Sequence, residues 1–130
     1  MITRRKKENS RYHDIVVKLT RMTANGELEW RRVSEPNLIG GQSDAFVADH
    51  NGRIFRIQDA LSYAQSRGNS DIGEGTFAVT NRRRHVLEVT GGSENKKIVF
   101  PKMRAVDNLA QLIKSHEKDD LQDLERSLDS

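Results

Sequence analysis

The chain has 130 residues, a formal net charge of +3 and 35% hydrophobic residues, which suits one domain with one hydrophobic core. The absence of cysteine excludes disulfides, thiolate metal sites and cysteine nucleophiles, and it fits a reducing, cytoplasmic location. No apolar run approaches the roughly 20 residues of a membrane span, and none follows the basic N-terminus as in a secretory signal. We therefore expect a cytoplasmic protein without a membrane partner.

The charge is unevenly distributed along the chain. Residues 117–130 hold six acidic and two basic side chains, a balance of −4, so residues 1–116 carry the remaining +7. A basic body can attract nucleic acid or another polyanion. An acidic tail can also fold back over the same basic surface and compete for it.

The first predicted elements are an arm and a helix. Residues 1–9 are polar and basic without periodicity, which predicts a basic disordered arm. Apolar residues then recur every three or four positions from Tyr12 to Met22, which predicts an amphipathic helix over residues 11–24. Gly26 is placed to end this helix, because Asn-Gly tolerates the left-handed backbone of a helix C-cap.

The period changes to two after this glycine. Leu28 and Trp30 alternate with charged residues, which predicts a half-buried strand with Trp30 on its inner face. A large aromatic side chain in that position contributes strongly to the core. We therefore interpret Trp30, the only tryptophan, as the residue that fastens the first helix to the sheet rather than as a ligand platform.

The middle of the chain predicts a hairpin and a long loop. The hairpin joins the β-rich runs 46–48 and 54–57 through residues 50–52, because Asn-Gly between such runs is a strong two-residue turn signal. The following residues 59–75 are rich in glycine and small polar side chains. They predict a surface loop with one helical turn.

The remaining chain predicts further strands and a helical end. A second hairpin pairs 76–79 with 85–89, and the run 98–100, closed by a proline, suits an edge strand. Helical periodicity returns at Val106 and continues to Leu128, as one helix or as a pair broken near residues 116–119.

The order of these elements is helix, about five strands, helix, which favours an α+β fold with an antiparallel sheet built from hairpins and both helices on one face. We expect residues 10–116 to form a single domain and residues 117–130 an acidic helical tail.

A short N-terminal pattern carries a resemblance. Residues 10–30, an amphipathic helix followed by Thr23-x-x-Gly26-x-x-x-Trp30, resemble the start of a group of small bacterial domains without an assigned chemistry. In that group a helix leads through a threonine, a glycine and a tryptophan into a small antiparallel sheet. The resemblance implies the same α+β fold through about residue 117, and it leaves the function open.

The sequence shows no convergent catalytic, cofactor-binding or metal-binding set. Ser43 and Ser62 lack a nucleophile motif, and the glycine-rich residues 68–75 lack the lysine of a phosphate loop. The histidines stand far apart without metal-ligand spacing, and we interpret all four as surface residues: His13, His50, His85 and His116. We therefore expect a protein that is not an enzyme and has no cofactor.

Basic clusters are the candidate nucleic-acid contacts, because mobile arms and protruding turns commonly meet phosphates. Aromatic residues make up only 5% of the chain, which disfavours a protein that stacks single-stranded bases. The candidates are Arg4, Arg5, Lys6 and Lys7 in the arm, Arg82, Arg83 and Arg84 at the predicted second hairpin tip, and Lys96 and Lys97 beside the last strand.

The candidate partner-binding residues are Leu121, Leu124 and Leu128, which share one helical face among acidic residues. This stripe either completes the domain's own core, which we favour, or docks in a partner that can be a second copy. The features together favour a small intracellular, non-enzymatic binding module that recognises a protein or mediates assembly. A nucleic-acid-binding protein is the alternative, and an enzyme with an unrecognised site ranks third.

Overall fold

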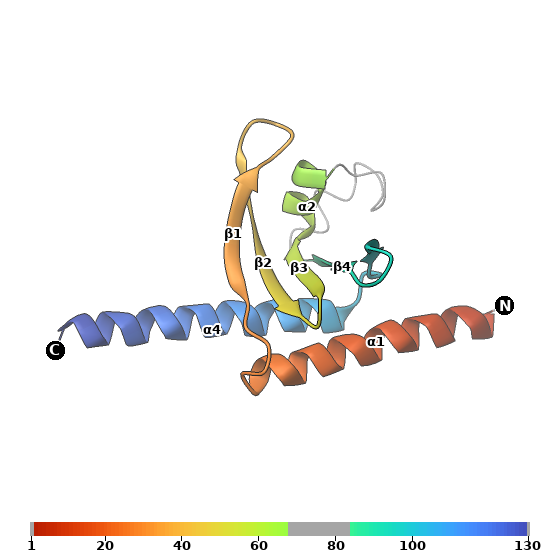
Figure 1. The fold of residues 1–130 in the computed structure, drawn as a ribbon, viewed down its shortest axis with the longest axis horizontal. Coiled ribbons are helices and arrows are strands. Elements are labelled where there is room, and N and C mark those ends of the chain that lie inside the picture. Colours follow the sequence, from red (N-terminus) through yellow and green to blue (C-terminus); the bar gives the residue numbers. More distant parts are fainter. Residues whose placement is uncertain (1, 68–83, 130) are drawn as a thin grey trace.

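The computed structural model describes residues 2–67 and 84–129 and has the predicted α+β architecture (Figure 1). Within these residues, five strands form one antiparallel sheet in the order of the sequence, β1-β2-β3-β4-β5. Helices precede the sheet, follow it and interrupt it after β3. The elements are α1 (Ile2–Ala24), β1 (Arg31–Pro36), β2 (Gln42–His50), β3 (Arg53–Asp59), α2 (Ala60–Arg67), β4 (His85–Gly91), β5 (Lys96–Val99) and α4 (Arg104–Asp129).

Helix α1 begins earlier than predicted. Residues 2–9, for which we predicted a disordered arm, are the first turns of the helix. This segment contains neither glycine nor proline, and its arginines and lysines are good helix formers. Extending a nucleated helix adds one hydrogen bond per residue. The periodicity missed these turns because it reports which residues face a core, and not which residues are helical.

The end of α1 is as predicted. Gly26 has a φ of 78°, and its amide donates to the carbonyl oxygen of Thr23 at 3.2 Å. The amide of Glu27 donates to the carbonyl oxygen of Met22 at 2.9 Å. These two bonds form the Schellman motif, in which glycine supplies the left-handed residue.

The chain between α1 and β1 differs from the prediction. The sheet begins at Arg31, so Leu28 and Trp30 lie in the link before the first strand rather than in it. Leu28 is nevertheless buried, and Trp30 is half-buried. The alternation therefore correctly indicated burial, whereas the strand that we predicted for these residues was wrong.

The first predicted hairpin is confirmed. β2 and β3 pair from Phe46 opposite Ile57 down to His50 opposite Arg53. The turn residues Asn51 and Gly52 have φ angles of 51° and 77°, the positive values that a two-residue type I′ turn requires. Of the second predicted hairpin, residues 76–79 lie outside the described residues, and their predicted partner is β4, which pairs with β3 and β5.

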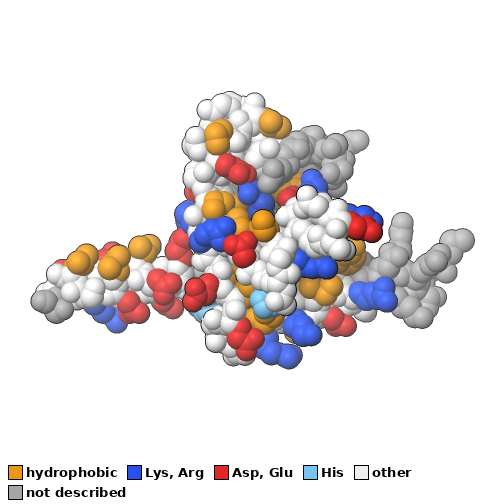
Figure 2. Space-filling view, viewed as in Figure 1, with side chains coloured by type: hydrophobic (Ala, Val, Ile, Leu, Met, Phe, Trp, Pro, Cys, Tyr) orange, Lys and Arg blue, Asp and Glu red, His pale blue; other side chains and the backbone are white. Residues whose placement is uncertain are grey.

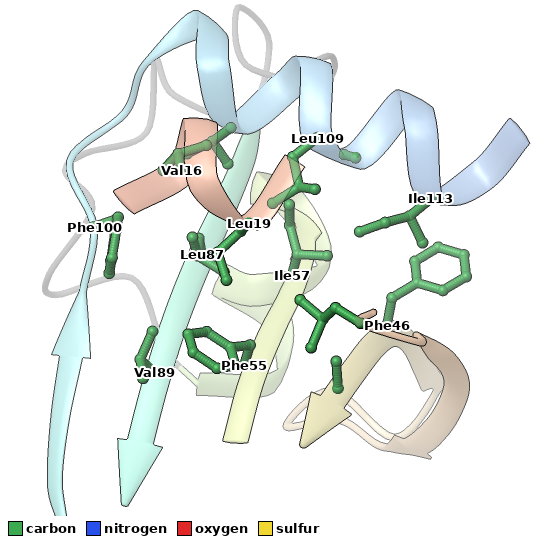
Figure 3. Close-up of a cluster of buried hydrophobic side chains, with 14 residues drawn as sticks. Val16, Leu19, Phe46, Phe55, Ile57, Leu87, Val89, Phe100, Leu109 and Ile113 are labelled. Atoms are coloured by element: carbon green, nitrogen blue, oxygen red, sulfur yellow. The ribbon is translucent and has the colours of Figure 1, made fainter. Parts of the chain in front are cut away.

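The main core lies between the sheet and the two long helices (Figure 3). Alternate residues of three neighbouring strands point to the helices, as the period of two requires. Helix α1 contributes Val16 and Leu19 to this core. Strands β2, β3 and β4 contribute Phe46, Ala48, Phe55, Ile57, Leu87 and Val89, and α4 contributes Val106, Leu109, Ala110 and Ile113.

The opposite face of the sheet carries α2 and several buried polar side chains. Tyr63 of α2 packs with Val86 of β4 in a smaller cluster. Arg56 of β3 is buried there, donates from Nε to Gln58 Oε1 at 3.2 Å, and forms an ion pair with Glu35 of β1. A buried guanidinium needs such partners, because leaving a buried charge unpaired is costly.

Candidate functional site

Helix α4 is continuous from Arg104 to Asp129, which answers whether the C-terminal segment is one helix or two. Its last buried residue is Ile113, and every residue from 118 to 129 is exposed. Figure 1 shows this second half extending past the sheet and past the end of α1. We call residues 118–129 the α4 overhang.

The α4 overhang exposes the leucine stripe. Leu121 and Leu124 are each 55% exposed, and Leu128 is 76% exposed. We favoured the packing of this stripe into the domain's own core, and that prediction was wrong. The cause is the length of α4, which continues beyond both β1 and the end of α1, so neither reaches the leucines. In Figure 2 hydrophobic side chains line one side of the overhang.

The stripe continues the buried face of the same helix. Val106, Ala110 and Ile113 are buried at spacings of four and three, and Leu121, Leu124 and Leu128 extend this pattern along α4. The periodicity alone therefore could not distinguish the part of this helix face that the sheet and α1 cover from the part that is exposed to solvent.

An open cavity of about 560 Å³ lies beside the base of the overhang, between the end of α1, the link before β1, and α4. Its lining combines apolar side chains with carboxylates, and we call it the acidic groove. The apolar lining includes Leu28, Trp30, Phe46 and Ile113, and the acidic lining consists of Glu29, Glu117, Asp119 and Asp120.

Trp30 holds the link against α1 at one wall of this groove. Its indole Nε1 donates to Thr23 Oγ1 at 2.9 Å, and the Thr23 hydroxyl donates to the carbonyl oxygen of Leu19 at 2.7 Å. The Trp30 ring also packs against the main core. These contacts agree with the fastening role inferred from the sequence.

An arginine of β1 ties the base of the overhang to the sheet. Arg32 donates to both carboxylate oxygens of Glu117, with its Nη2 2.6 Å from Oε1 and its Nε 3.0 Å from Oε2. Its Nη1 lies 3.1 Å from Asp44 Oδ2. The hydrogen bond from Arg32, supported by its charge, lowers the pKa of Glu117 against the opposing effect of burial. The bidentate pair therefore favours the ionised carboxylate.

The Arg32–Glu117 pair predicts a pH-dependent stability. Because the folded-state pKa of Glu117 is lowered, the pair stabilises the fold at neutral pH. That contribution is lost as the pH falls from about 4.3, the ordinary pKa of glutamate, through the lowered pKa of Glu117 in the folded state. We expect Glu117→Gln to be slightly less stable than the wild type at neutral pH, with a difference that disappears in acid. Urea unfolding across a pH series measures this.

The control for this series is Glu94→Gln, because Glu94 forms an exposed ion pair with Lys96 that contributes little. It should follow the wild type at each pH. A Glu117→Gln deficit that stays constant from neutral to acid pH would show that the carboxylate acts through its shape and not through its charge.

His85 is buried, so our interpretation of all four histidines as surface residues was wrong at this position. Its Nδ1 lies 3.0 Å from Asp107 Oδ1, which also accepts the His85 backbone amide at 2.8 Å. Its Nε2 lies 3.2 Å from Lys114 Nζ. The alternation of His85 with Leu87 and Val89 along β4 could have indicated that it points toward α4.

This arrangement joins the start of α4 to β4, since one carboxylate oxygen of Asp107 accepts two donors from a neighbouring strand. The sequence showed only that Asp107 lies in the first turn of a helix. In the part of the chain that the structure describes, no group of three or more histidine, aspartate or glutamate side chains could hold a metal ion.

The basic candidates come from three places in the fold. Arg4, Arg5, Lys6 and Lys7 belong to the first turns of α1, Arg84 Nη1 lies 3.8 Å from Asp107 Oδ2, and Lys96 Nζ lies 2.6 Å from Glu94 Oε2. Lys97 follows Lys96 in β5, so the two point to opposite faces of the sheet. Arg82 and Arg83 lie outside the described residues.

The overhang points away from the basic start of α1, because the two lie at opposite ends of the molecule (Figure 1). The acidic tail therefore does not fold back over this part of the basic surface. Leu38 and Ile39, in the loop between β1 and β2, are among the other exposed hydrophobic residues. No helix among the described residues is long and apolar enough to cross a membrane.

Comparisons with protein families, curated proteins and solved structures found no match to this chain.

Proposed function

We propose that this protein is an assembly module that associates with further copies of itself through the α4 overhang. The observation that supports the proposal is the leucine stripe, which continues the core-facing side of α4 into solvent. Three leucines at spacings of three and four are the anchors with which an amphipathic helix docks on a partner. Burying a fully exposed leucine is worth about 1.5 to 3 kcal/mol, and covering these leucines, which are 55% to 76% exposed, contributes part of that value for each side chain.

The helical state of the overhang supports the same proposal. An isolated helix shorter than about 12 to 15 residues is marginal in water, and every residue of the overhang beyond the Arg32–Glu117 pair is exposed. A surface helix gains most of its stability from packing its apolar face. A second copy would supply that packing.

Sedimentation velocity over a wide range of protein concentration tests the proposal. The wild type should show a sedimentation coefficient that rises with concentration. A variant with Leu121→Gln, Leu124→Gln and Leu128→Gln should remain monomeric while keeping the circular dichroism of the wild type measured in dilute solution, because no replaced side chain is buried.

The matched control is Leu38→Gln with Ile39→Gln, which removes hydrophobic side chains that are 71% and 72% exposed at a different site. This control should associate like the wild type. A wild type that stays monomeric throughout, or a leucine variant that associates as strongly as the wild type, would contradict the proposal.

A further inference from the structure

We infer that the acidic groove and the α4 overhang of one copy receive the basic start of α1 from the next copy, so that the chains assemble head to tail. This inference rests on the proposed function and identifies the surface that covers the overhang. It follows from the stagger of the two long helices, from the face of α4 that borders the groove, and from the charges of the two protruding ends.

The stagger places the two ends on opposite sides of the body. In Figure 1 α1 and α4 run in the same direction side by side, and the start of α1 projects at one end while the overhang projects at the other. Helix α1 is 23 residues long, about 35 Å at 1.5 Å per residue. Its basic start therefore cannot reach the groove at its own C-terminal end. Only a second copy can bring the two together.

The face of α4 that borders the end of α1 continues into the overhang. Ile113, His116 and Asp120 line the groove together with Thr23 at the end of α1 and Gly26 just after it. Their spacing of three and four continues to Asp123, which therefore lies on the same side of the helix. An α1 helix from another copy, placed in line with the first, would meet an acidic surface beside the leucine stripe.

The charges of the two ends are complementary. Residues 2–9 contain four basic side chains and Glu8, a balance of +3, whereas residues 118–129 contain five acidic and two basic side chains, a balance of −3. Pairing two overhangs with each other would place like charges together, which costs free energy at an interface. Pairing an overhang with the start of α1 opposes unlike charges.

The apolar lining of the groove suits the same occupant. Lysine and arginine bury their aliphatic stems against apolar surface while their charged ends remain in water. Trp30 and Phe46 line the groove together with Glu29 and Asp119. A head-to-tail contact uses two different surfaces, so each copy keeps one free end and the assembly grows into a chain or closes into a ring.

The test combines two variants that are each defective at one end. The α1 variant carries Arg4→Glu, Arg5→Glu, Lys6→Glu and Lys7→Glu, and acidic residues near a helix N-terminus favour the helix. Its matched control carries Lys96→Glu, Lys97→Glu, Lys102→Glu and Arg104→Glu, which gives the same net charge with an intact α1. The overhang variant carries the three Leu→Gln changes. Sedimentation velocity follows each variant alone and in an equimolar mixture.

We expect the α1 variant to self-associate at least about tenfold more weakly than its matched control. The overhang variant should be monomeric. The mixture should form 1:1 complexes and nothing larger, because it contains one intact α1 start and one intact overhang for each pair. Added salt should weaken wild-type association, since screening reduces the attraction between unlike charges.

Two other outcomes separate the head-to-tail inference from the proposed function. In the first, the α1 variant self-associates as strongly as its control, the mixture forms no new complex, and salt strengthens wild-type association. This result would overturn the head-to-tail inference in favour of pairing between overhangs, and it would leave the proposed function intact. A wild type that remains monomeric at every concentration would overturn both.

Discussion

Replacing Leu109 with alanine should destabilise the monomer by about 2 to 5 kcal/mol, whereas the same replacement at Leu124 should change its stability by less than about 0.5 kcal/mol. Both leucines lie on α4, within the same periodic pattern. Leu109 is fully buried in the main core, so its removal leaves a cavity, whereas Leu124 is 55% exposed. Urea unfolding at low protein concentration, where association is negligible, measures both values.

This comparison tests where along α4 the packing against the main core ends. Alanine has the highest helix propensity, so neither replacement harms the helix itself. A loss at Leu124 comparable to the loss at Leu109 would mean that the overhang packs into its own chain. The exposed stripe would then no longer be a candidate assembly surface.

Replacing Trp30 with alanine should destabilise the protein by about 3 kcal/mol, the lower end of the range for buried aromatic residues, because the ring is only half-buried. The replacement removes both the ring packing and the hydrogen bond to Thr23. Trp30→Phe should cost less, about 1 kcal/mol for the lost hydrogen bond. Thermal and urea unfolding provide the measurement.

A double-mutant cycle of Trp30→Phe and Thr23→Val isolates this hydrogen bond. The two changes should be non-additive by about 0.5 kcal/mol or more, because they remove the same interaction. Trp30→Ala unfolding like the wild type would contradict the fastening role and would leave the groove as the main reason for a tryptophan at this position.

The parts of the fold that were predicted correctly depend on local chemistry. Gly26 ends α1, and Asn51-Gly52 turns the first hairpin, because both positions need a backbone conformation that few residues tolerate. The apolar periods of three to four and of two located the long helices and most of the strands. These signals are complete within a few residues and need no knowledge of the neighbouring elements.

The errors occurred where the outcome depends on tertiary placement. The pattern at Leu28 and Trp30 showed burial but could not show that the sheet begins only at Arg31. The leucines of the overhang have the same spacing as the buried residues of α4, and only the end of α1 and the edge at β1 determine which of them are covered. The acidic groove brings together residues that are far apart in the chain, so no local sequence motif predicts it.

The candidate site was therefore predicted only in part. Leu121, Leu124 and Leu128 were singled out from the sequence, whereas the groove and the clamp between Arg32 and Glu117 appeared only when β1 and α4 were placed side by side. The burial of His85 against Asp107 has the same cause, since the two residues come from different elements.

Hydrogen exchange resolved along α4, recorded as a function of protein concentration, tests most directly whether the overhang is an assembly surface. Amides of residues 106–113 should be protected at every concentration, because the core covers them. Amides of residues 121–129 should exchange rapidly in dilute protein and become protected as the concentration rises, with no such change in the leucine variant. Equally rapid exchange of residues 121–129 at all concentrations would contradict the account.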